Sequence, residues 1–143
     1  MPIHPKQFIF SNMVKDWSAP VWEQFQKNNY AKTVLRNGDP VACAGLTKVW
    51  HGRAIIWGVF SQFCNRYDML HLYREGNKFI SKAQEMPEYR RIETTTHSGN
   101  PIDIRWVEKL GFYQEAVMPA YDAMGDTHYL YSKINMDLVG DIR

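Results

Sequence analysis

The sequence predicts one α+β domain built on a mixed, mostly antiparallel β-sheet that is flanked by helices. Three observations carry this prediction. Strand-like apolar runs, separated by tight-turn residues, occupy residues 31–60. Two stretches with the 3.6-residue hydrophobic period of an amphipathic helix follow them. Strand-like segments separate and close those helices, and no linker or repeat divides the 143 residues, so we place a single domain over 1–143.

The composition argues against several classes of protein. Hydrophobic residues make up 45% of the chain, which suits a packed core rather than disorder. The formal net charge of +2 is too small to indicate nucleic acid or an anionic membrane as the main partner. No stretch approaches the roughly 18 apolar residues of a membrane span, and the N-terminus lacks the layout of a secretion signal. Cys43 and Cys64 do not make a disulfide framework, so we expect a cytoplasmic protein with both thiols reduced.

The chain begins with residues that favour a short helix. Ser18 is a typical N-cap residue, and Pro20 suits the first turn of the helix that would follow. Val21, Trp22 and Phe25 then supply an apolar stripe. We expect a helix over this segment, before the first strand.

A three-stranded antiparallel meander is predicted next. Its strand-like runs are 31–36, 41–49 and 54–60. Asn37-Gly38 separates the first two, and both residues tolerate the positive φ that a tight hairpin turn demands. His51-Gly52 marks the second break. The third run is almost continuously apolar, which predicts a strand buried on both faces.

A long helix should follow the meander. Six residues recur at helical spacing: Met69, Leu72, Tyr73, Gly76, Ile80 and Ala83. Either Asn65 or Asp68 is suited to cap its start, and Pro87 marks a point by which the helix has ended. Residues 91–96 then read as a strand, because three β-branched threonines occur in a row.

The second helix has recognisable residues at both ends. Asn100 is an N-cap type, Pro101 takes the first helical position, and Asp103 places negative charge near the exposed amides of the first turn. Gly111 closes the helix, since it accepts the left-handed conformation. Its expected apolar stripe is Ile102, Trp106, Val107 and Leu110. A closing strand pair, 112–118 and 127–134, surrounds a loop that contains Gly125.

Residues 100–112, NPIDIRWVEKLGF, resemble the second motif of the GNAT superfamily of acetyl-CoA-dependent N-acetyltransferases. In that motif an Asn opens a helix that ends in a Lys-x-Gly-Phe sequence. Any capped amphipathic helix ending in Gly-Phe gives a similar pattern, but the order of elements on either side is also the GNAT order. The resemblance covers roughly residues 20–134.

The resemblance implies an enzyme that uses acetyl-CoA to acetylate a primary amine. In the family the fourth and fifth strands splay apart and hold the pantetheine arm of the cofactor, and here those strands would be 54–60 and 91–96. Gly58 suits either a β-bulge that starts the splay or a close packing contact. Asn100 suits either a cofactor contact or plain helix capping. The implied cofactor-binding residues are Gly58, Val59, Phe60, Ser61, Arg66 and Asn100.

Two departures from the family pattern concern binding and chemistry. The segment 61–68, SQFCNRYD, lacks the glycine turn whose amides would hold the pyrophosphate, although Arg66 offers positive charge. Val107 occupies the position where many members place a Tyr that protonates the departing thiolate, and the run 54–60 contains no carboxylate to act as a base.

The remaining catalytic candidates are His97 and Tyr121. His97 follows the strand 91–96, where a neutral imidazole can relay the amine proton, and its alternative role is that of a solvated loop residue. Tyr121 either assists or packs at the rim. The five histidines show no ligand spacing with the cysteines, so no metal is predicted. A basic strip is expected to be a solvated face rather than a nucleic-acid site: Arg74, Lys78, Lys82, Arg90 and Arg91.

A second hypothesis belongs to another functional class. The departures above favour a GNAT-like binding or assembly protein that has lost the cofactor chemistry. In its aromatic richness the chain is also similar to small GNAT-like proteins of tailed bacteriophages, some of which are associated with virion assembly or host takeover. Fold alone does not choose between the two hypotheses. Binding of coenzyme A does.

Overall fold

The computed structural model describes residues 29–140, with side chains from residue 33 onward. The helix expected around residues 18–25 lies outside this range. The described elements are β1 (Asn29–Arg36), β2 (Asp39–Trp50), β3 (Arg53–Phe60), α3 (Arg66–Ala83), η2 (Pro87–Tyr89), β4 (Arg91–His97), α4 (Pro101–Lys109), β5 (Tyr113–Met118), β6 (His128–Ile134) and η3 (Met136–Leu138). Their order is the one predicted, with two single-turn 3-10 helices added.

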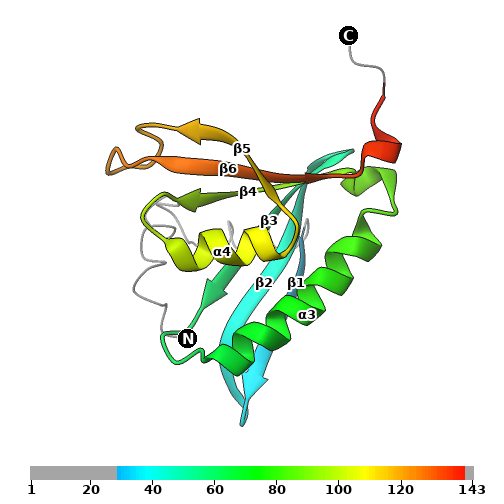
Figure 1. Cartoon of the computed structure of the whole chain (residues 1–143). Helices are drawn as coiled ribbons and strands as arrows, with labels where there is room; N and C mark the ends of the chain where they lie inside the picture. The colour runs from blue at the N-terminus through cyan, green and yellow to red at the C-terminus, as the bar shows by residue number, and fades with distance from the viewer. Residues whose placement is uncertain (1–28, 141–143) are drawn as a thin grey trace, which may run out of the picture.

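The strands form one six-stranded sheet in the order β1-β2-β3-β4-β6-β5 (Figure 1). All neighbouring strands run antiparallel except β3 and β4, which are parallel. The prediction of a mixed, mostly antiparallel sheet is therefore confirmed. α3 and α4 both lie against the same face of this sheet (Figure 1).

The turns of the meander form where glycine and asparagine predicted them. Asn37 and Gly38 have φ angles of 53° and 84°, the left-handed pair that a tight β1–β2 hairpin needs. Gly52, with φ 97°, turns β2 into β3. The positive φ favours glycine at this position, whereas a Cβ atom there would meet only the flexible guanidinium end of Arg90, at 2.6 Å.

β3 and β4 pair at one end only. Their parallel register joins Arg53 to Arg91, Ala54 to Ile92 and Ile55 to Glu93, and beyond these residues the two strands no longer pair (Figure 1). The expected splay between these strands is confirmed. Of the two roles considered for Gly58, the β-bulge is wrong, because the β2–β3 register runs unbroken past the Ala44–Gly58 pair and the splay has already begun after Ile55. The alternative, a close packing contact, agrees with the 3.2 Å that would separate a Cβ atom at Gly58 from Phe60 Cζ.

The core lies between the sheet and the two helices. It joins three groups of side chains: Leu46, Ala54 and Ile56 from β2 and β3; Ile92 and Tyr131 from β4 and β6; and Ile80, Ala83, Val107, Leu110 and Phe112 from α3, α4 and the segment after it. Ile102 does not belong to the inward face of α4, since it is 45% exposed. Ile104 and Trp106 pack against the core instead, so the predicted stripe was wrong at its first residue.

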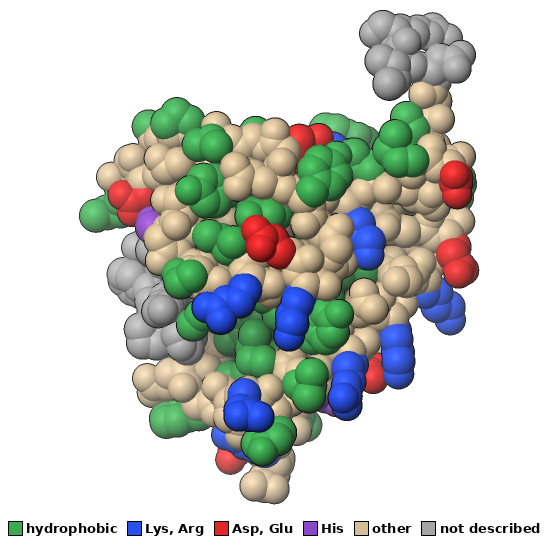
Figure 2. Space-filling model, in the orientation of Figure 1, with side chains coloured by type: hydrophobic (Ala, Val, Ile, Leu, Met, Phe, Trp, Pro, Cys, Tyr) green, Lys and Arg blue, Asp and Glu red, His purple; other side chains and the backbone are tan. Residues whose placement is uncertain are grey.

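The expected basic strip is present along α3 but does not continue to Arg90 and Arg91. Arg74, Lys78 and Lys82 are exposed on α3, and Figure 2 shows Lys and Arg side chains scattered among other types over this face. Arg91 instead pairs with carboxylates of the sheet, and Arg90 packs over Gly52. Within residues 29–140, no helix is both long enough and apolar enough to cross a membrane.

Candidate functional site

The diverging strands open onto a cavity of about 490 Å³. Residues of β3 and β4 supply most of its lining, the first two turns of α4 close one side, and Met118, Tyr121, His128 and Leu130 come from the end of β5, the following loop and the start of β6. The prediction that β3 is buried on both faces holds only in part, because Ile55, Gly58 and Val59 are half-buried. The first two of these line the cavity.

Both faces of the sheet contribute to this cavity. Successive side chains of a strand point to opposite faces. Ile56 belongs to the core that α4 covers, and the Phe60 ring meets the Trp106 ring edge-on at 5.8 Å between centroids. Ile55 and Trp57 alternate with them and face the other side, yet all four residues line the cavity. The cavity therefore passes between the strands rather than resting on one face.

A charged network joins β3 and β4 where they pair, at the closed end of the wedge-shaped gap between the two strands. Glu93, on β4, accepts a hydrogen bond from Arg53 Nε at 2.8 Å and another from Arg91 Nε at 2.7 Å. Arg91 also pairs with Glu115 of β5. Burial raises the pKa of Glu93, but hydrogen bonds and charges from Arg53 and Arg91 outweigh burial and hold it below its ordinary value. Glu93 is therefore an ionised linker between strands and not a free base.

The start of α4 borders the cavity through a buried cap. Asn100 is 4% exposed, and its Oδ1 accepts from the backbone N–H of Asp103 at 3.2 Å. Its Nδ2 donates to the Asp103 carboxylate at 2.8 Å. One turn further on, Val107 lines the cavity with no ionisable group. Helix capping is thus the observed role of Asn100, in a position where it also faces the cavity.

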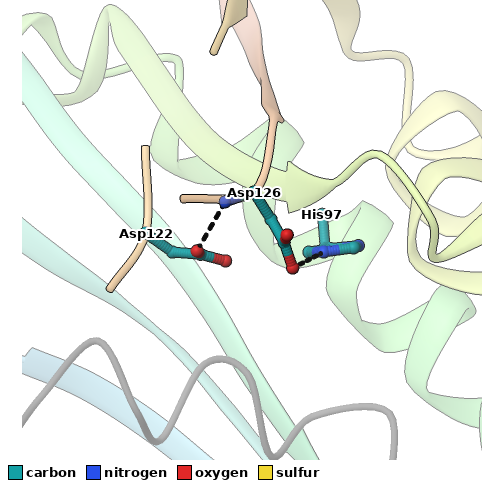
Figure 3. A group of neighbouring side chains, drawn as sticks. All are labelled: His97, Asp122 and Asp126. Atoms are coloured by element: carbon teal, nitrogen blue, oxygen red, sulfur yellow. Dashed lines mark hydrogen bonds and ion pairs between the residues drawn. The ribbon is translucent and has the colours of Figure 1, made fainter. Parts of the chain in front are cut away.

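His97 lies at the end of β4, and one of its ring nitrogens meets the Asp126 carboxylate (Figure 3). Its Nδ1 accepts from the backbone N–H of Gly99 at 2.9 Å, and its Nε2 lies 2.9 Å from Asp126 Oδ2. A backbone N–H always donates, so Nε2 carries the proton in the neutral ring and donates it to Asp126. His97 must give up one of these bonds before it takes a proton.

A second histidine–aspartate pair lies directly beside the first. His128 pairs with His97 in the β4–β6 register, and the two rings meet edge-on at 5.3 Å. Its Nε2 lies 2.9 Å from Asp122 Oδ2, and the two side chains are only 4% and 2% exposed. The Tyr121 ring, 43% exposed, lies 5.0 Å from the His128 ring. The sequence analysis missed this pair, because no recognised spacing links Asp122 to His128.

His97, Asp122 and Asp126 lie side by side (Figure 3), and each offers one potential metal-ligand atom within 4.8 Å of the other two. Hydrogen bonds already use these groups. Asp122 Oδ1 accepts from the backbone N–H groups of Met124 and Asp126 at 3.0 and 2.9 Å, and Asp126 Oδ2 is bonded to His97. The three side chains form a hydrogen-bonded network that shapes the β5–β6 loop, and we assign no cation to them.

The N-terminus of α3 is capped by its own side chains. Asn65 Oδ1 accepts from the backbone N–H groups of Tyr67 and Asp68, both at 3.0 Å. Asp68 Oδ2 in turn accepts from the backbone N–H of Asn65 at 2.9 Å and forms an ion pair with Arg36 at 2.6 Å. The two residues suggested as alternative caps thus form one capping box. First-turn amides that would bind a phosphate are occupied, and a carboxylate lies among them.

The predicted site residues fall into two groups. Five line the cavity: Gly58, Phe60, His97, Asn100 and Tyr121. Val59, Ser61 and Arg66 do not. Ser61 is 1% exposed and its Oγ accepts from the backbone N–H of Phe63 at 3.1 Å, while the Arg66 guanidinium lies 5.4 Å from the centre of the Tyr67 ring.

No protein-family model matches the sequence, and no curated protein matches it. Its fold is nevertheless similar to those of solved acetyltransferases. Ribosomal-protein-S5-alanine acetyltransferase from Vibrio fischeri is 17% identical, with a TM-score of 0.66 over 85% of this chain and 69% of that one. A spermidine N-acetyltransferase variant from Vibrio cholerae is 11% identical, with a TM-score of 0.66 over 85% and 77% of the two chains.

A third similar structure was solved with acetyl-CoA bound. It is a GNAT family acetyltransferase from Elizabethkingia anophelis, 10% identical, with a TM-score of 0.62 over 87% of this chain and 88% of that one. At such identities the likeness shows the fold. The chain therefore has the GNAT fold that residues 100–112 and the element order predicted.

Proposed function

We propose that this GNAT-fold protein is an N-acetyltransferase that moves the acetyl group of acetyl-CoA to a primary amine. The observation that carries the proposal is the one-ended pairing of β3 and β4, which leaves a cavity lined from both faces of the sheet. A cavity of this form lets a thioester and an amine meet between the strands. Much of the rate enhancement then comes from holding the two reactants together.

The residues of the wedge fit the pantetheine arm of acetyl-CoA. Beyond Ile55 and Glu93, β3 and β4 do not pair with each other, so the gap between them has the elongated form that an extended amide chain needs. Gly58 and Phe60 line this part of the cavity. A Cβ atom at Gly58 would lie 3.2 Å from Phe60 Cζ, so glycine keeps the passage wide.

The residues at the N-terminus of α3 fit the pyrophosphate less well. The Asn65–Asp68 capping box occupies the amides, and the Asp68 carboxylate would repel a phosphate. Arg36 already pairs with Asp68. Cofactor affinity should therefore depend on the pantetheine arm in the wedge more than on phosphate contacts at this helix.

The two predicted catalytic candidates border the acceptor side of the cavity. His97 and Tyr121 both line it, and each lies beside His128. We place the amine here, on the sheet face opposite α4. Val107, which lines the cavity, has no proton to donate to the departing thiolate. Solvent supplies that proton instead, which is sufficient because a thiolate is a weak base.

A thermal shift with CoA tests the proposal. Any ligand that prefers the folded state stabilises it, by about 2.7 kcal/mol at a hundredfold excess over Kd. We expect millimolar CoA to raise the Tm by several degrees, whereas adenosine 3′-phosphate 5′-diphosphate, which lacks the pantetheine arm, should shift it much less. Incubation with acetyl-CoA and either spermidine or a peptide beginning with alanine should then add the mass of one acetyl group to an amine.

Gly58→Val provides the structural arm of this test. Valine narrows the wedge beside Phe60, so the CoA-induced shift, measured against the variant's own ligand-free Tm, should disappear. Gly140→Val is the matched control, because nothing lies within 4 Å of a Cβ atom at Gly140. A wild-type protein that neither shifts with CoA nor acetylates either probe contradicts the proposal.

A second candidate function has one observation in its favour. The capping box on α3 removes the phosphate cradle, as expected for a GNAT-fold binding or assembly protein without cofactor chemistry, for example one encoded by a tailed bacteriophage. Absence of any CoA shift would favour this function.

The cysteines are consistent with a reducing cytoplasm, where we place the protein. Cys43 and Cys64 are both free thiols. Burial and the Asp68 charge raise the pKa of the Cys64 thiol, which keeps it protonated and a poor nucleophile. We therefore propose direct transfer to the amine rather than transfer through a cysteine.

A further inference from the structure

His128 is a buried imidazole with one nitrogen left unused. Its Nε2 bonds to Asp122, but its Nδ1 is buried and has no hydrogen-bond partner among the described residues. Burying a polar atom without a partner costs free energy, and native proteins keep few such atoms. Because His128 lines the cavity, a molecule bound there is an available partner for this Nδ1.

The surroundings of Asp122 fix which nitrogen carries the proton. Asp122 Oδ1 accepts two backbone N–H groups, from Met124 and Asp126, and Oδ2 faces His128. The Asp126 amide, followed by the His128 ring, holds the pKa of Asp122 below its ordinary value. An ionised carboxylate only accepts, so His128 Nε2 carries the hydrogen and Nδ1 keeps its lone pair.

The position of His128 in the sheet places it on the acceptor side. Tyr131 belongs to the core that α4 covers, so His128, three residues earlier, faces the opposite side of the sheet. His97 is its register partner and shares that side. The Tyr121 ring lies against His128 and is itself exposed, and both residues line the cavity.

We infer that His128, held in one tautomer by Asp122, is the catalytic base that removes the proton from the acceptor amine. The inference rests on the proposed acetyltransferase function and names a residue for it. The amine nitrogen attacks the thioester carbonyl carbon, and a C–N bond forms. Nδ1 takes the proton from that nitrogen, the C–S bond breaks, and CoA leaves as a thiolate. The imidazolium returns its proton to solvent, and the thiolate takes one from solvent.

Neighbouring groups are less suited to this role. Both nitrogens of His97 are engaged, with Asp126 and Gly99. Glu93 is held between two arginines. Burial, with the Glu108 hydrogen bond, raises the pKa of Tyr131 to about 12, and this residue lies on the α4 side. Among the residues that the structure describes, the titratable groups that face His128 are thus Asp122 and Tyr121 from the β5–β6 loop and His97 from β4.

The test compares His128→Gln with His97→Gln, two histidines that share a register pair and each have an aspartate partner. The readout is CoA thiol release from acetyl-CoA with spermidine or the alanine peptide, followed from about pH 6 to about pH 9. We expect His128→Gln to lower kcat/KM by about 100-fold or more and to leave a pH profile that follows only the ionisation of the acceptor amine, which lies at about pH 8 for the alanine peptide. The CoA-induced Tm shift should persist. His97→Gln should keep the shape of the wild-type profile.

The outcomes separate the two claims. An active wild type whose His128→Gln variant keeps the wild-type kcat/KM and the wild-type pH profile overturns the role of His128 and leaves the acetyltransferase proposal standing. A wild type that neither binds CoA nor releases thiol overturns both.

A second measurement covers the case in which His128→Gln does not fold. Nitrogen-15 shifts of the wild-type histidines should show His128 as the Nε2–H tautomer, and Asp122→Asn should reduce kcat/KM at least about tenfold while disturbing that tautomer. An Nδ1–H tautomer in the wild type overturns the inference without any activity assay.

Discussion

At the scale of single residues, one carboxylate holds two strands at the vertex of the wedge. Glu93 is buried with its side chain 9% exposed, and it bonds to Arg53 from β3 and to Arg91 from its own strand. The pair formed by Lys48 and Glu88 has the same chemistry on the surface, with side chains 41% and 43% exposed. Burial should make the first arrangement costly to break and the second nearly neutral.

Glu93→Gln is therefore expected to destabilise the fold. The amide retains one acceptor but turns a donor toward an arginine, which leaves buried charge without its partner, at a cost of about 1–3 kcal/mol. Urea unfolding followed by far-UV circular dichroism measures the difference. Glu88→Gln is the control and should leave the midpoint unchanged. Equal midpoints for the two variants would show that the network does not hold the strands.

At the scale of elements, α3 shows how a local capping choice affects binding. A capping box stabilises the helix by giving its first-turn amides partners within the chain. The same amides are then unavailable to a phosphate, and Asp68 adds a negative charge where a phosphate would approach. Helix stability and anion binding thus compete for the same atoms.

Asp68→Asn should tighten CoA binding if CoA binds at all. The amide oxygen can still accept from the Asn65 N–H, while the repelling charge is lost and Arg36 is released. A gain of roughly two- to fivefold in affinity is expected from removing one charge at a helix N-terminus. Calorimetric titration with CoA and with pantetheine, which lacks the phosphates, provides the measurement and its control. An equal gain for pantetheine would contradict the electrostatic explanation.

The elements themselves were largely predictable from local sequence. Asn37-Gly38 marks a left-handed backbone that few other residues adopt, and Asn100-Pro101 joins an N-cap side chain to a residue suited to the first helical turn. The structure has a hairpin and a helix start at those places. The prediction that Ile102 is buried was wrong, because i and i+4 spacing does not show how much of a helix lies over the sheet that it covers. The splay was expected through family resemblance, but of the two roles left open for Gly58 the β-bulge was wrong.

The site was less predictable, for a physical reason. His128 and Asp122 meet because the β5–β6 loop folds back on itself around the Asp122 carboxylate. His97 joins them only through the pairing of β4 with β6. Contacts made by register and loop geometry leave no periodic trace in the sequence, whereas caps and turns do.

At the scale of the whole molecule, stability should fall on acidification. The pKa values of Glu93, Asp122 and Glu115 are all below their ordinary values of 4.5, 3.8 and 4.5. A depressed pKa in the folded state means that the unfolded state binds protons first as the pH falls. The stabilisation is thus complete above about pH 5 and is lost progressively below it, toward about pH 3.

Urea midpoints measured at about pH 7, 5, 4 and 3 check this expectation. The midpoint should stay level down to about pH 5 and then drop, and the drop should be smaller in Glu93→Gln, which lacks one of the three carboxylates. A midpoint that remains constant to about pH 3 would show that these carboxylates are not stabilised by folding.

The short parallel pairing and the Arg53–Glu93 ion pair fix β3 and β4 to each other at one end. The two strands diverge from this end, so a small change in the angle between them becomes a larger displacement at their far ends. Substitutions around Arg53 and Glu93 would then alter the aperture beside Phe60 and His97 without touching either residue. The width of the molecule that the cavity accepts would thus depend on side chains that do not contact that molecule.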